Sequence, residues 1–253
     1  MNKTTSPILG CALAGVLALG VIPARAVTII LNPIADTTLQ EAFSSNNFGD
    51  GTSFQAGGRR KGGRTRGLLL FDIAGNIPAG ATITSAALSL SVVGVPSGGV
   101  ASTFDLHRAL AGWGEGNGSD HGGSPGAANQ ATWNNRLGSG TPWTTAGGDF
   151  SPTVSASRAI SGLGAYAFSS TASTVSDVQG WLDSPANDFG WLMASAAEAS
   201  PTSIRRFANR SDVANTPTLT VQYGVVPEPA TLSLGALGLL LAASFRRRSQ
   251  PER

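Results

Sequence analysis

The sequence predicts an all-β fold, a single β-sandwich of the jelly-roll type between two terminal segments. Many short β-branched or alternating runs are separated by Gly, Pro and Asn turns, which is typical of sandwiches. Only one stretch, 175–183, has helical spacing, with Val175, Val178 and Leu182 on one face and Thr174 as the expected cap. The middle of the chain, about 200 residues, suits one domain. We therefore expect a leader at 1–26, a sandwich at 27–224 and a tail at 225–253.

The predicted strands follow one another along the whole middle region. The clearest is 86–92, where Leu88, Leu90 and Val92 alternate onto one face. A Gly-rich connection at 58–64 predicts a hairpin. The Gly/Ser/Asn-rich stretch 112–148 has no strand pattern, and we expect a functional loop region there rather than core. The other expected strands are 27–31, 53–57, 65–71, 103–108, 165–169, 191–194, 204–208 and 218–223.

The first residues have the layout of a secretory signal peptide. Lys3 gives a positive start, 8–22 form an apolar stretch, and Ala24-Arg25-Ala26 is an A-x-A cleavage site. Cleavage after Ala26 makes Val27 the first mature residue. The chain is therefore predicted to be exported.

The C-terminal segment has three parts in a fixed order. Val226-Pro227-Glu228-Pro229 is followed by an apolar run at 230–245 and by Arg246, Arg247 and Arg248. A membrane anchor with positive-inside flanks is one interpretation, but the run is short of the about 20 apolar residues of a stable span. The three parts resemble the PEP-CTERM sorting tail. The resemblance implies an exosortase-type processing enzyme as partner, transient insertion of the tail helix in the inner membrane, and a final place at the cell surface or in the extracellular matrix.

Charge and cysteine content narrow the function classes. Between Val27 and Val226 there are 11 Lys/Arg and 13 Asp/Glu, a net charge of −2, so the basic character of the chain belongs largely to its ends. Nothing in this balance favours nucleic acid as a partner. The single cysteine, Cys11, lies in the leader, which excludes disulfides and thiolate catalysis in the mature chain.

A series of short motifs follows in order along the chain between 34 and 223. They lie at 35–38, 46–49, 66–73, 77–83, 85–88, 113–115, 132–134, 142–143, 187–191, 207–210 and 217–219. In this order they resemble the DNRLRE-type domains, which are related to disaggregatase-related and alginate-binding modules. The resemblance implies a β-sandwich and, in some members, polysaccharide binding. One departure is Arg210-Ser211, where the family commonly has Arg-Glu, so no role of that glutamate is carried over.

Two groups of residues are candidates for polysaccharide binding. The stretch 59–66 holds five positive charges in eight residues, which suit the carboxylates or sulfates of an acidic polymer or, alternatively, a solvated hairpin tip. Three tryptophans in the loop-rich middle suit either stacking on sugar rings or structural packing. The candidates are Arg59, Arg60, Lys61, Arg64 and Arg66, with Trp113, Trp133 and Trp143.

Asp36, Asn46, Asn47 and Asp50 are candidate ligands of a structural calcium ion, because calcium takes several loop oxygens. The alternative is that these residues only make turns. No other cofactor is expected.

Catalytic signatures are sparse. The mature chain has two histidines, His107 and His121, and neither lies in a recognised nucleophile or zinc motif. Glu115 and Asp120 are close in sequence, but a flexible loop fixes no separation between them. We therefore expect a non-catalytic module that binds or organises exopolysaccharide, with a polysaccharide-degrading lyase or hydrolase, or a structural surface protein without ligand, as alternatives.

Overall fold

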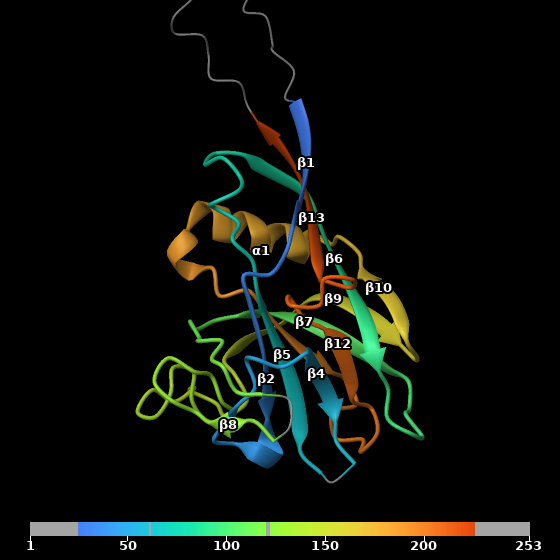
Figure 1. The fold of residues 1–253 in the computed structure, drawn as a ribbon. Helices are drawn as coiled ribbons and strands as arrows, with labels where there is room; N and C mark the ends of the chain where they lie inside the picture. The colour runs from blue at the N-terminus through green and yellow to red at the C-terminus, as the bar shows by residue number, and fades with distance from the viewer. Residues whose placement is uncertain (1–24, 61, 120–121, 226–253) are drawn as a thin grey trace, which may run out of the picture. The chain divides into compact units, whose positions relative to one another are not determined.

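Two antiparallel sheets packed face to face make the all-β sandwich that the sequence predicts (Figure 1). The computed structural model describes residues 25–60, 62–119 and 122–225, which cluster as one unit. The predicted signal sequence before Arg25 and the predicted tail from Val226 onward lie outside the described residues.

The first sheet is organised around its longest strand, β6 (Thr82–Gly94). Strands β13 (Thr218–Val225) and β12 (Arg205–Ala208) pair with β6, and β10 (Gly164–Phe168) pairs with it as well. Strand β1 (Arg25–Leu31) lies outside β13, from Arg25 opposite Val225 to Leu31 opposite Leu219. Strand β4 (Ser53–Gly58) continues the sheet beyond β12.

The second sheet holds the remaining long strands. Its order is β2 (Ala35–Gln40), β5 (Arg64–Leu70), β11 (Trp191–Ser195), β7 (Ser102–Ala109) and β9 (Phe150–Ile160). Strand β4 also pairs with β5, through Gly57 opposite Thr65, so β4 connects the two sheets. Short elements complete the fold: η1 (Glu41–Phe43), η2 (Pro185–Asn187), and the pair β3 (Asn46–Asn47) and β8 (Ser124–Pro125).

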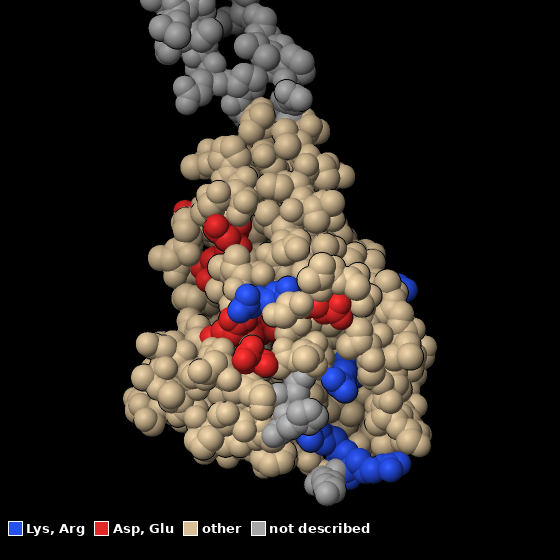
Figure 2. Space-filling model, viewed as in Figure 1, with Lys and Arg blue, Asp and Glu red and all other residues tan. Residues whose placement is uncertain are grey.

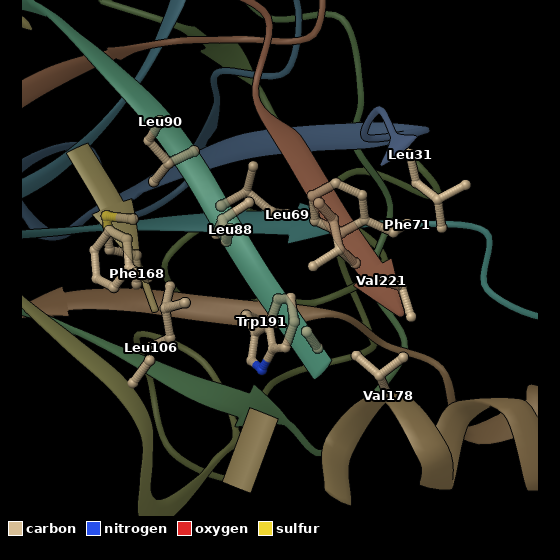
Figure 3. Packing of buried hydrophobic residues seen from close by; sticks show 14 of the residues in the cluster. Leu31, Leu69, Phe71, Leu88, Leu90, Leu106, Phe168, Val178, Trp191 and Val221 are labelled. Atoms are coloured by element: carbon tan, nitrogen blue, oxygen red, sulfur yellow. The ribbon is translucent and has the colours of Figure 1, made fainter. Parts of the chain in front are cut away.

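The main core lies between the sheets. Leu88, Leu90 and Val92 are each at most 3% exposed, which confirms the alternation predicted for this strand. The helix α1 (Ala172–Asp183) closes one side of the core, and Figure 3 shows Val178 of this helix pointing toward the cluster that holds Trp191. Burial of these apolar faces is the main stabilising contribution in a chain whose described part has no disulfide.

The helix cap differs from the prediction. Thr171, not Thr174, is the cap: its Oγ1 accepts a hydrogen bond from the backbone N–H of Thr174 at 3.0 Å. The hydroxyl of Thr174 accepts in return from the Thr171 N–H at 2.9 Å and also donates to the Ala86 carbonyl on β6 at 2.9 Å. The helical spacing identified the helix but placed its start about one turn late.

A second apolar cluster lies on the outer face of the second sheet. Leu39, Leu68 and Leu192 project from three neighbouring strands and pack against Trp133 and Trp143 of the long loop region. The stretch 112–148 was expected to be a functional loop region rather than core, and this part of the expectation is wrong. Because the second sheet has apolar residues on both faces, the loop must cover it.

Candidate functional site

The basic stretch 59–66 divides into two parts with different surroundings. Figure 2 shows Lys and Arg side chains gathered at the end of the sandwich that carries the β4–β5 hairpin. Arg59 and Arg60 lie at the tip of this hairpin, whereas Arg64 and Arg66 lie within β5. Lys61 lies outside the described residues.

Arg64 and Arg66 already have ion-pair partners within the protein. Arg64 forms an ion pair with Glu41 at 2.8 Å, and the Arg64 hydrogen bonds lower the pKa of that carboxyl to about 2. Arg66 is buried, donates to both carboxylate oxygens of Glu198 at 2.7 and 3.0 Å, and lies over the Trp133 ring. These two arginines therefore have their counter-charges and stacking partners already.

Arg59 and Arg60 instead border a pocket of about 300 Å³ together with Arg206 of β12. The strand register brings Arg206 to this pocket, because Arg206 lies opposite Gln55 of β4 on one side and Gly94 of β6 on the other. The sequence prediction missed Arg206, which is far from 59–66 along the chain. A signal was present, since Arg205-Arg206 stands in an expected strand of a slightly acidic domain.

The three arginines of this pocket, named here the arginine pocket, have neutral partners. Arg59 donates to the Gln40 side chain, Arg60 to the Ser97 carbonyl at 3.2 Å, and Arg206 to the Ser53 hydroxyl at 3.2 Å. Within the described part of the chain, none of them forms an ion pair.

Burial lowers the pKa of Arg59, because the guanidinium has lost water without gaining a carboxylate. A guanidinium carries five N–H donors, so most donors of the arginine pocket remain available.

The three candidate tryptophans are packing residues in this structure. Trp133 and Trp143 are 3% and 4% exposed, so neither ring offers a free face to a sugar. The Trp143 Nε1 donates to the Thr132 carbonyl at 2.9 Å, and the half-buried Trp113 donates to the Phe189 carbonyl at 2.9 Å. Their surroundings therefore fit structural packing, which the sequence left open as the alternative to stacking on sugar rings.

Three of the four candidate calcium ligands use their side chains in hydrogen bonds within the fold. Asn47 is fully buried; its Oδ1 accepts from the N–H groups of Gly49 and Gly118, and its Nδ2 donates to two carbonyls. Asp36 accepts from the Arg210 N–H at 2.8 Å, and Asn46 donates to the Gly122 carbonyl at 2.6 Å.

Asp50 is exposed. In the described ranges, no group of three or more His, Cys, Asp or Glu side chains is placed to hold a metal. A calcium ion held by Asp36, Asn46, Asn47 and Asp50 therefore stays a prediction.

The histidine that the structure describes has no catalytic partner. The Nδ1 of His107 lies 2.9 Å from the Ser151 carbonyl, and its ring packs on Phe150. His121 and Asp120 lie outside the described residues. Glu115 is held by Arg210 through two hydrogen bonds of 2.6 and 2.8 Å, an arrangement of a structural ion pair.

One of the predicted processing residues, Ala26, lies in the described part of the chain. Ala26 is in β1 opposite Gly224, so cleavage after Ala26 would leave the pairs from Val27–Tyr223 to Leu31–Leu219 intact. The remaining processing candidates fall outside the described residues; they are Val226, Pro227, Glu228, Pro229, Arg246, Arg247 and Arg248.

Comparison with known protein families matches residues 225–248 to the PEP-CTERM protein-sorting motif, the segment that the sequence predicted. The motif indicates an exported surface protein that is sorted by an exosortase. No curated protein matches the sequence. In the ranges that the structure describes, no helix combines the length and apolarity needed to cross a membrane.

Proposed function

We propose that this exported protein binds an acidic polysaccharide at the cell surface, without cleaving it, through the arginine pocket. The observation that carries the proposal is the meeting of Arg59, Arg60 and Arg206 around one pocket, where none of them pairs with a carboxylate of the described residues. Arginine forks pair with carboxylates and sulfates through two parallel hydrogen bonds. Each such charge-assisted contact contributes about 1.5–3 kcal/mol.

Two further points support this function. The domain has a net charge of −2 over 27–226, so a local concentration of unpaired arginines is not a by-product of a basic surface. The motifs that resemble DNRLRE-type domains point the same way, because some members of that family bind polysaccharide.

The test is binding of the full-length chain to polygalacturonate, alginate and dextran sulfate at low salt, with uncharged dextran for comparison. We expect binding to an acidic polymer that weakens as salt rises, because ions screen exposed charges. The triple variant Arg59→Gln, Arg60→Gln, Arg206→Gln should weaken it tenfold or more, since about 1.4 kcal/mol is a factor of ten.

The matched control is Arg158→Gln. Arg158 is an exposed arginine of β9 that lies over the Tyr166 ring, outside the arginine pocket. Absence of binding to all three acidic polymers, or equal losses in the triple variant and the control, would overturn the proposal. The first result would favour a structural surface protein without ligand.

One observation favours a polysaccharide-degrading enzyme as a second candidate. Burial, followed by the like charge of Asp72, raises the pKa of Asp188 to about 7, so this carboxyl keeps its proton up to near-neutral pH. A carboxyl whose pKa is raised by burial and a nearby acid is typical of general acid–base sites. Release of reducing or unsaturated ends from the same polymers, lost in Asp188→Asn, would establish this activity.

A further inference from the structure

A groove of about 800 Å³ lies on the loop-covered side of the second sheet. Leu110 to Gly112 follow β7 along the groove, and Phe150 begins β9 beside them. Phe189 and Arg136 come from two separate loops. The size lies within the range of small-molecule sites, which is about 300–1,000 Å³.

The lining combines apolar surface with a single cation. Phe150 and Phe189 are partly exposed, and Leu110 is 48% exposed. A ligand that covers these side chains would therefore remove apolar surface from water. Arg136 donates one hydrogen bond, to the Gly112 carbonyl at 3.1 Å, and within the described ranges it forms no ion pair. Most of its guanidinium donors therefore remain available to a ligand.

The acidic residue of the groove, Asp149, already accepts hydrogen bonds from the protein backbone. Both carboxylate oxygens of Asp149 accept backbone hydrogen bonds, from Thr144 and Thr145, each at 2.9 Å. These two donors offset part of its charge, and its remaining lone pairs can accept hydroxyl groups.

The loops that form the groove are held by hydrogen bonds to one another. Trp113 donates to the Phe189 carbonyl, and the Leu110 N–H donates to the Asp149 carbonyl at 2.9 Å. The hairpin that carries Arg136 is closed by a hydrogen bond from the Arg136 N–H to the Thr141 carbonyl at 3.0 Å. Sites that are already ordered bind with a smaller loss of conformational entropy.

From this lining we infer a second ligand site, which binds one uronate unit, a sugar ring that bears a carboxylate. The apolar face of the sugar ring packs on Phe189, because the Phe150 ring already contacts Arg66 and His107. The sugar carboxylate pairs with Arg136, and sugar hydroxyls donate to Asp149. A neutral sugar would leave Arg136 without its partner. The inference rests on the proposed function for its ligand class, but it concerns a site that shares no lining residue with the arginine pocket.

The test uses trigalacturonate and its neutral counterpart, α-1,4-linked galactotriose, with the full-length chain, measured by titration calorimetry. We expect trigalacturonate to bind and the galactotriose to bind at least tenfold more weakly. Arg136→Met should reduce trigalacturonate affinity tenfold or more, and Phe189→Leu should reduce it severalfold, because leucine keeps apolar volume but lacks a flat ring. Thermal unfolding of each variant confirms that it folds.

Arg158→Met is the matched control and should bind like the wild type. Unchanged affinity in both groove variants, or equal binding of the two sugars, would overturn the second site. That failure is distinguishable from failure of the proposed function, because the triple arginine-pocket variant would still lose binding to the polymer. If instead the groove variants lose trigalacturonate while the triple variant keeps the polymer, the groove stands and the arginine pocket does not.

Discussion

Replacing Asp188 with asparagine should stabilise the protein, but only at pH values above the ordinary Asp pKa of 3.8. Asp188 follows η2 and accepts a hydrogen bond from the Gly190 N–H at 3.2 Å. Burial raises its pKa from 3.8 to about 7, and the like charge of Asp72 adds to the effect. Between these two values the folded state keeps a proton that the unfolded state has lost. The Asp188 contribution is therefore most favourable below pH 3.8, and stability falls as pH rises toward 7.

The size of the effect follows from the same values. A difference of about 3 pH units corresponds to about 4 kcal/mol at about 1.4 kcal/mol per unit. Because Asp188 is only partly buried, solvent screening reduces this, and we expect about 2 kcal/mol. Asparagine keeps the acceptor for Gly190 and has no charge to bury.

Urea unfolding followed by tryptophan fluorescence, at pH 4 and at pH 8.5, measures this. Asp188→Asn should match the wild type at pH 4 and exceed its free energy of unfolding by about 2 kcal/mol at pH 8.5. The control is Asp183→Asn, an exposed carboxyl whose hydrogen bond from Gln179 an amide can retain. A gain in Asp188→Asn that is equal at both pH values would refute the reasoning.

Three further substitutions test the packing around the sites by thermal and urea unfolding. Arg66→Met should cost about 3–5 kcal/mol, because the Glu198 carboxylate loses its bidentate partner in a largely buried setting, and pairing it with Glu198→Leu should recover part of that loss. Trp143→Phe should cost about 1–3 kcal/mol by leaving the buried Thr132 carbonyl without its Nε1 donor. Gly190→Ala should cost about 3 kcal/mol or more, since φ is +71° and a Cβ there would lie 1.9 Å from the Leu69 carbonyl oxygen. Losses within measurement error would contradict each reason.

The sequence carried most of the fold because strand alternation and turn residues are local signals. Leu88, Leu90 and Val92 show the period of two that burial of one sheet face imposes, and they are buried. Strand β9 was missed because 150–160 does not alternate. Ser155 and Ala156 are buried together at its middle, and 152–154 and 157–159 on either side are exposed. Strand β2 was missed because most of its residues are polar. Thr37 and Thr38 are nevertheless buried in the part of β2 that pairs with β5.

The loop region shows where local signals fail. Its Gly and Asn content indicates irregular backbone, which is what the structure has, but says nothing of what the loop covers. Trp133 and Trp143 are buried because Leu68 and Leu192 present an apolar outer face to them. That face is visible only after β5 and β11 are paired, a contact between residues far apart in the chain.

The same distinction explains why the basic stretch was only partly informative as a site. Counting charges in 59–66 treats its members as equivalent, although Arg64 and Arg66 lie two apart on β5 and so share a face, where Glu41 and Glu198 neutralise them. A carboxylate on the ligand gains little from arginines that are already paired. Arg59 and Arg60, at the hairpin tip, pair with no acid among the described residues, and the third member of their pocket comes from β12. Whether an arginine already has a paired acid therefore decides if it is a candidate for binding a ligand, and only tertiary structure supplies that information.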